Sequence, residues 1–159
     1  MNDYKRLSEL EEIIDLLYEK LSIFQKELIT SSSPLIQFEL KQRIQKEIIP
    51  NIRSYEAEYW RNYPEEEINL SEDESKTQLV RIESAITSLS NINKSELPPQ
   101  MISLLQNLQM KLTEDKIVSA KLKLAIPIIP MIVSYELEIE TEGYMYKTWM
   151  TLKRLIRRK

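Results

Sequence analysis

The chain has 159 residues, 42% of them hydrophobic and 30% charged, and this length suits one domain or two small helical units with a sizeable core. Its net charge at pH 7 is −3, and it contains no cysteine, no histidine and a single glycine, Gly143. These counts exclude disulfides, thiolate and histidine catalysis, the usual zinc sites and glycine-rich phosphate loops, and they favour long helices joined by short turns.

Residues 7–59 are predicted to form two antiparallel helices that fold back at residues 31–34. Apolar residues recur at steps of three and four along both arms, which is typical of a coiled-coil seam. The two series are Leu7, Leu10, Ile14, Leu17, Leu21, Phe24 and Leu28, then Ile36, Leu40, Ile44, Ile48, Ile52, Tyr55 and Tyr59. Facing residues of an antiparallel pair share a constant sum of residue numbers, and here that sum stays between 64 and 66. The pattern predicts a long helical hairpin over residues 1–63.

This hairpin has more apolar surface than its seam requires. Four apolar residues lie off the seam: Ile13, Leu16, Tyr18 and Ile23. Another part of the chain or another subunit is expected to cover them. Ser33 and Pro34 suit the cap and first position of the second arm. Pro50 lies inside that arm and predicts a kink near Lys46.

Residues 64–71 are predicted to be an acidic linker, and residues 72–126 a second helical hairpin. Ser71 and Glu74 have the spacing of a capping box at the start of this hairpin. Its two apolar stripes are Leu79, Ile82, Ile86 and Leu89, then Met101, Leu105, Leu108 and Leu112. A breaker-rich turn at residues 93–99 separates them.

Residues 127–159 are predicted to hold an extended segment followed by a helix. Near residues 131–140 the apolar residues Val133, Tyr135, Leu137 and Ile139 alternate with polar ones, which is typical of a half-buried strand. A lone strand needs an edge to pair with, and the chain offers no convincing one. Pairing with another copy or another protein would supply the edge; alternatively, the segment packs extended along the helices.

The C-terminal residues 144–159 are predicted to form a basic amphipathic helix. They hold six bases and no acid, whereas the preceding residues hold 16 bases and 25 acids, a net charge of −9. Met145, Trp149, Leu152 and Ile156 mark the apolar face of this helix. Such a helix can dock on an acidic protein surface or on anionic lipid.

Two stretches resemble a known class of module. Residues 17–21 (LYEKL) and 38–44 (FELKQRI), with the serine turn between them, resemble helical effector-associated modules of bacterial multidomain signalling and conflict proteins. The stretch from residue 128 to residue 138 resembles a short C-terminal element of such proteins. The resemblance covers about half of the chain. It implies adaptor or oligomerisation work and a role in bacterial defence, and it supplies no catalytic residues.

The sequence therefore predicts a mainly α, non-enzymatic interaction and oligomerisation module, an adaptor or effector-associated protein. It predicts no catalytic residue, no cofactor and no metal, and protein partners that include further copies of the chain. The absence of a signal peptide and of a long apolar run predicts a cytoplasmic location. The expected interaction residues are Val133, Tyr135, Leu137, Ile139, Trp149, Lys153, Arg154, Arg157 and Arg158.

Two alternative functions stay open. A membrane-docking or membrane-active effector would use the apolar residues 125–133 and the basic C-terminal helix. A nucleic-acid-binding accessory protein would use the same helix, but the acidic remainder of the chain argues against it.

Overall fold

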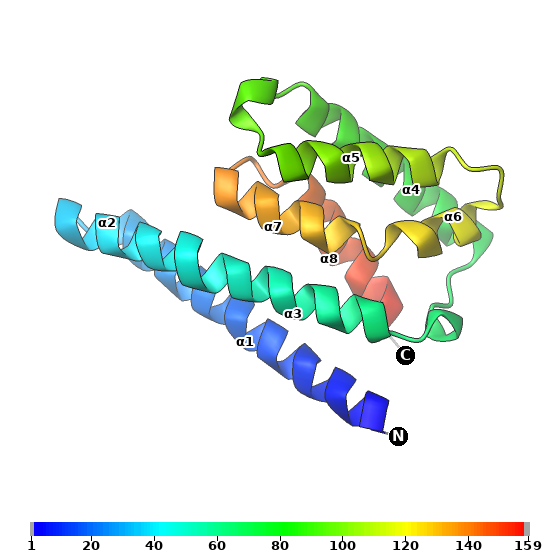
Figure 1. Ribbon diagram of the computed structural model, residues 1–159, viewed down its shortest axis with the longest axis horizontal. Coiled ribbons are helices and arrows are strands. Elements are labelled where there is room, and N and C mark those ends of the chain that lie inside the picture. Colours follow the sequence, from blue (N-terminus) through cyan, green and yellow to red (C-terminus); the bar gives the residue numbers. More distant parts are fainter. Residues whose placement is uncertain (1, 158–159) are drawn as a thin grey trace. The chain divides into compact units, whose positions relative to one another are not determined.

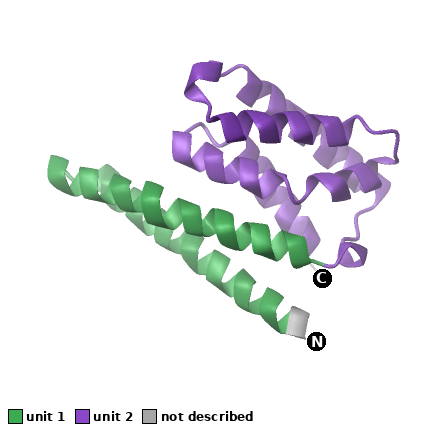
Figure 2. Ribbon diagram, in the orientation of Figure 1, with its two compact units in different colours: residues 1–63 green, residues 64–159 purple. Residues whose placement is uncertain are grey.

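The computed structural model describes residues 2–157, with side chains from residue 4 onward. These residues form helices and connecting turns, with no strand among them (Figure 1), which confirms the predicted mainly α class. The chain divides into two compact units, residues 1–63 and 64–159 (Figure 2), and each is described by itself below.

The first unit consists of α1 (Asn2–Thr30), α2 (Pro34–Arg43), the π-helical turn η1 (Ile44–Ile48) and α3 (Ile49–Asn62). Helix α1 packs along α2, η1 and α3. Ser33 caps α2 by accepting a hydrogen bond from the Ile36 N–H, and Pro34 occupies the first helical position, where no N–H is needed. The core between the arms contains Leu10, Ile14, Leu21, Ile48 and Ile52.

A π-helical turn occupies the second arm where the sequence predicts a proline kink. Pro50 has no N–H to donate to the Lys46 carbonyl, and its ring would crowd that oxygen in a regular helix. The chain widens instead, and the Ile49 N–H donates to the carbonyl of Ile44. Four residues turn an α-helix by about 400°, so apolar residues spaced by four drift round its surface. A wider turn rotates less per residue and offsets this drift, and the four-spaced residues remain buried: Leu40, Ile44, Ile48 and Ile52.

The second unit is a bundle of helices. After a short 3₁₀ turn η2 (Glu65–Glu67), it contains α4 (Glu72–Ser90), the 3₁₀ turn η3 (Lys94–Glu96), α5 (Pro99–Leu112), α6 (Val118–Ala125), α7 (Ile129–Ile139) and α8 (Tyr144–Arg157). Helix α4 packs on α5, α6 and α8, while α7 packs on α5 and α8. The predicted capping box of Ser71 and Glu74 is confirmed at the start of α4. Fully buried side chains include Ile82, Leu89, Met101, Leu108, Leu122 and Trp149.

The prediction of an extended or β segment near residues 131–140 is wrong, because these residues form most of helix α7. Helix α7 buries Ile129, Pro130, Ile132, Val133, Ser134 and Glu136. Four of these, Ile129, Ile132, Val133 and Glu136, have the spacing of one helix face. The glutamate interrupts the apolar stripe of the helix. The sequence therefore shows apolar residues at every second position from Val133 to Ile139, and this alternation suggests a strand. Pro130, which reads as a breaker, lies in the first turn of α7, where proline is tolerated.

Candidate functional site

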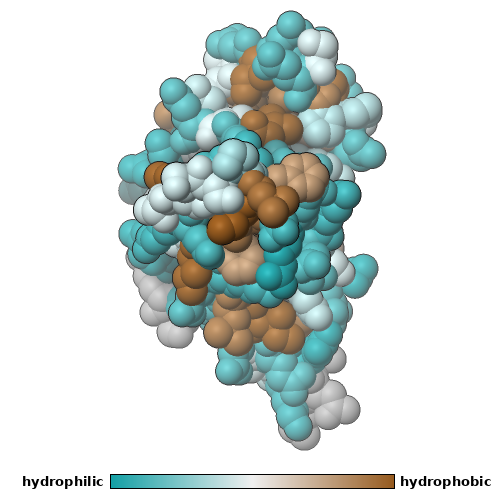
Figure 3. All heavy atoms as spheres, turned by 90° about the vertical axis from the view of Figure 1, so that its left-hand side faces the viewer, coloured by the Kyte–Doolittle hydropathy of each residue, from teal (hydrophilic) through white to brown (hydrophobic). Residues whose placement is uncertain are grey.

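The turn end of the first unit exposes a group of large apolar side chains. We call Ile29, Leu35, Ile36 and Phe38 the turn patch; their side chains are 82%, 66%, 44% and 61% exposed. Figure 3 looks from the side on which this turn lies and shows hydrophobic residues at the surface among polar ones. Together these side chains expose roughly 400 Å² of apolar surface, distributed over more than one side of the helical turn.

Two further large apolar side chains are exposed on α1. Leu16 and Ile23 are 58% and 55% exposed and lie seven residues apart, so they share one face of the helix. Phe24, which belongs to the seam, is half-buried, and Lys20 and Arg43 lie over its ring at 5.7 and 5.4 Å. These cations cover the aromatic face and leave the turn patch uncovered.

The opposite end of the first unit is closed by polar and aromatic contacts. Arg6 of α1 donates two hydrogen bonds to Glu58 of α3, at 2.7 and 3.0 Å. The Arg6 hydrogen bond lowers the pKa of Glu58 below its ordinary value. The Tyr59 hydroxyl donates to Glu11 at 3.3 Å, and the rings of Tyr59, Trp60 and Tyr63 contact one another. The two arms are therefore tied together at this end and present the turn patch at the other.

The residues predicted to form an association strand do not share a face in helix α7. Val133 is fully buried, while Tyr135, Leu137 and Ile139 are half-buried. Residues two apart point to different sides of a helix, so the apolar row expected along residues 133–139 does not exist. The part of the chain that the structure describes therefore offers no strand edge at these residues.

The predicted interaction residues of the C-terminal helix divide between interior and surface. Trp149 is fully buried and Lys153 is 5% exposed. Arg154 is exposed and Arg157 is half-buried, while Arg158 lies outside the described residues. The helix therefore presents fewer of its bases to an outside surface than its sequence suggests.

Two carboxylates of the second unit hold the starts of neighbouring helices. The Glu136 oxygens accept hydrogen bonds from the backbone N–H groups of Met145 and Tyr146 at 3.0 and 2.7 Å. In the same way Glu72 accepts from Val118 and Ser119, at 2.9 and 3.2 Å. Negative charge at a helix N-terminus is favourable because free N–H groups and the helix dipole both attract it. Glu72 and Glu136 therefore stabilise the starts of α6 and α8.

The described residues offer no metal site and no single helix that could span a membrane. No group of three or more acidic side chains within them is arranged to hold a metal ion. Helices α6 and α7 together reach the length and composition of a span, but they bend by 52° at their junction. Their apolar residues Leu122, Ala125, Ile129 and Ile132 are fully buried in the structure, as expected for core helices.

The turn patch is the feature that sequence reasoning missed. The seam pattern predicts that Ile36 is buried, and it makes no prediction for Leu35 or Phe38. A signal was present, because apolar residues at positions 35, 36 and 38 lie on several sides of one helical turn. A single partner helix covers only one of those sides.

Comparisons of this chain with protein-family models, with curated proteins and with solved structures found no match.

Proposed function

We propose that the chain is a non-enzymatic helical interaction module that self-associates through the turn patch of its first unit. The observation that carries this proposal is the exposure of Ile29, Leu35, Ile36 and Phe38 at one end of a helical pair. Large exposed apolar side chains favour burial against a partner, and Leu35 and Phe38, three residues apart, share one face of α2.

A second copy of the chain is the partner that the charges around the turn patch favour. Residues 19–43 carry four bases and three acids, so a two-fold contact between equal patches meets little net repulsion. An anionic membrane or a strongly acidic protein would favour a more basic surround than this one. A nearly balanced charge instead favours contact between two copies of the same surface.

The size of the patch sets the expected strength of the association. Stable interfaces bury about 800 Å² on each partner, roughly twice the estimated area of the turn patch. Leu16 and Ile23 would enlarge the contact if the α1 helices lie alongside each other. We therefore expect a reversible dimer whose population depends on concentration.

An adaptor role in bacterial signalling or defence is part of the proposal and rests on the sequence resemblance of residues 17–21 and 38–44. The second of these stretches begins with Phe38 of the turn patch. Self-association is a common requirement of adaptors, and the two ideas therefore agree without depending on each other.

The test is the mass of the full chain in solution over a wide concentration range. We expect the mass by light scattering to rise from 18.9 kDa toward twice that value with concentration. Phe38→Ser should keep the chain monomeric at all concentrations, with an unchanged circular dichroism spectrum. Met110→Ser is the matched control, because Met110 is 68% exposed on α5 of the other unit and should leave dimerisation intact.

Two results would count against the proposal. A chain that stays monomeric at every concentration has no self-association to explain. A dimer that survives in Phe38→Ser and in Leu35→Ser uses another surface. Binding of a monomeric chain to anionic vesicles, lost in Phe38→Ser, would favour the membrane-docking alternative instead.

A further inference from the structure

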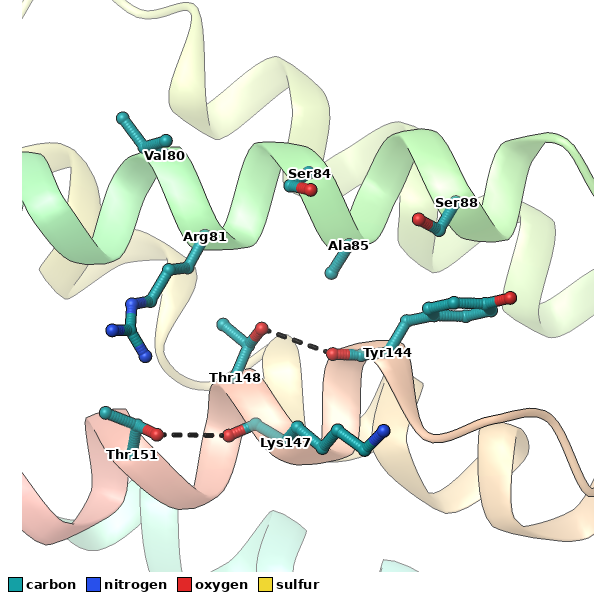
Figure 4. A pocket seen from close by; sticks show the side chains of 9 residues that line it. All are labelled: Val80, Arg81, Ser84, Ala85, Ser88, Tyr144, Lys147, Thr148 and Thr151. Carbon is teal, nitrogen blue, oxygen red and sulfur yellow. Dashed lines mark hydrogen bonds between the residues drawn. The ribbon is translucent and has the colours of Figure 1, made fainter.

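A groove of about 470 Å³ lies between α4 and α8 in the second unit (Figure 4). This volume falls in the range of small-ligand sites. The groove has no acidic lining residue, although acids outnumber bases by 25 to 22 in the chain. It is lined from α4 by Val80, Arg81, Ser84, Ala85 and Ser88, and from α8 by Tyr144, Lys147, Thr148 and Thr151.

Two cations flank the groove, one from each wall. Arg81 extends from α4 toward α8, and Lys147 extends along α8 with its amine toward Tyr144 (Figure 4). Both side chains are exposed, and neither forms an ion pair with any residue that the structure describes. Helical spacing explains this, because the residues three and four positions from each of them are uncharged. Both positive charges are therefore available to a ligand.

Two serine hydroxyls of α4 add neutral hydrogen-bond donors to the groove. Ser84 and Ser88 lie one turn apart on α4, and neither hydroxyl forms a hydrogen bond with the described part of the chain. Thr148 and Thr151 differ, because their hydroxyls already donate to the carbonyls of Tyr144 and Lys147, each at 3.2 Å. The free donors are thus a guanidinium, an ammonium and two hydroxyls, which suit the acceptor-only oxygens of a phosphate group.

The two ends of the groove differ in charge. Tyr144 stands at one end, and its hydroxyl donates to Glu142 at 3.0 Å. Beyond Tyr144 lies a second hollow of about 480 Å³ that includes Glu96, Glu140 and Glu142 in its lining. Lys147 offsets part of this negative charge at the Tyr144 end, whereas Arg81 at the other end has no acid among the residues that line the groove. The Tyr144 ring therefore suits the uncharged body of a ligand.

We propose that this groove binds a small phosphate monoester, with the phosphate group near Arg81 and the Ser84 hydroxyl and the organic body toward Ser88 and Tyr144. A monoester carries close to two negative charges at neutral pH; Arg81 can bind the phosphate group directly, and Lys147 adds positive charge from the α8 wall. The groove is larger than a phosphate ion, so the ester's organic body fills the remaining space. This inference is independent of the turn patch, which lies in the other unit.

Phenyl phosphate, titrated into the ¹⁵N-labelled full chain at low salt, tests the proposal. We expect amide shifts concentrated at the lining residues of α4 and α8 and a saturable curve. Arg81→Gln should weaken binding about tenfold, since it removes a charge-assisted bidentate donor. Ser84→Ala should weaken it about threefold, as expected for one neutral hydrogen bond. Lys94→Gln is the matched control, because it removes one exposed positive charge outside the groove and should leave binding unchanged.

Three outcomes would overturn the proposal. Equal weakening in Lys94→Gln and Arg81→Gln would mean general charge attraction. Binding of benzoate as tight as that of phenyl phosphate would remove the preference for phosphate. A titration curve that does not saturate, or amide shifts outside the groove, would show that phenyl phosphate does not bind there. If binding holds, vesicles containing phosphatidic acid identify its source: Arg81-dependent flotation assigns a lipid headgroup, and no flotation assigns a soluble ester.

Discussion

Glu136 is a buried polar residue that makes the helix containing it hard to predict from the sequence. Its side chain is 1% exposed, yet both oxygens accept backbone hydrogen bonds from the first turn of α8. A buried carboxylate is tolerated when donors satisfy it in this way. The link to α8 also contains Gly143, the chain's one glycine, at φ 79°, where other residues are strained. These two residues fix the α7–α8 connection.

Replacing Glu136 by Ala should destabilise the second unit. The change leaves two backbone N–H groups, one buried and one partly buried, without their acceptor, and the buried one alone costs about 1–3 kcal/mol. The measurement is the free energy of urea unfolding, with Glu83→Ala at an exposed α4 position as control. If the two variants unfold alike, the carboxylate contributes nothing to holding α8.

Glu72 should make stability depend on pH in the acid range. A hydrogen bond from the Ser119 side chain, with the backbone N–H groups of Ser119 and Val118, lowers the pKa of Glu72 from its ordinary value of 4.5. The unfolded chain therefore takes up the proton at higher pH than the folded chain. The stabilising contribution is complete above about pH 4.5 and is lost as the pH falls through the lower folded pKa.

The test of this pH dependence compares Glu72→Gln with the natural chain in urea unfolding from pH 7 to pH 3. The natural chain should be more stable at neutral pH, and the difference should shrink below pH 4.5 as Glu72 becomes protonated. Glu83→Gln serves as the control. A difference that stays constant over this range would show that the charge of Glu72 is not what stabilises the start of α6.

At the scale of elements, sequence periodicity predicts the helical class and several helix starts but not the conformation of residues 131–140. Ser33 and the Ser71–Glu74 pair cap α2 and α4 as local spacing indicates. Helix α7 could not be predicted in this way, because the reason for Glu136 being buried lies on α8. The turn patch and the α4–α8 groove likewise depend on which helices become neighbours. Local spacing does not contain that information.

Leu137→Pro separates the helical conformation of α7 from an extended one. In the helix, proline removes a backbone hydrogen bond and clashes with the preceding turn, at a cost of about 3 kcal/mol or more. We expect helical circular dichroism and unfolding free energy both to fall, with Leu137→Ala as control for the lost side chain. Unchanged helical content in Leu137→Pro would support an extended segment.

At the scale of the whole molecule, each compact unit has a core of its own. Leu10, Ile14 and Ile52 are fully buried in the first unit, and Ile82 and Leu108 in the second. A unit with its own core can in principle unfold by itself. We propose that the two units are separate folding units, so that the turn patch can change without affecting the groove.

The two tryptophans of the chain allow this proposal to be tested unit by unit. Trp60 lies in α3 and Trp149 in α8, and both are buried, so each should report unfolding of its own unit by a red shift of its emission. Ile14→Ala removes fully buried methyl groups from the first core and should cost about 2–5 kcal/mol there. In a Trp149→Phe background, Ile14→Ala should move the urea midpoint seen by Trp60 to lower concentration. In a Trp60→Phe background, the midpoint seen by Trp149 should stay where it is. Equal movement of both midpoints would mean that the chain unfolds as one cooperative structure, and the two units would then share their stability.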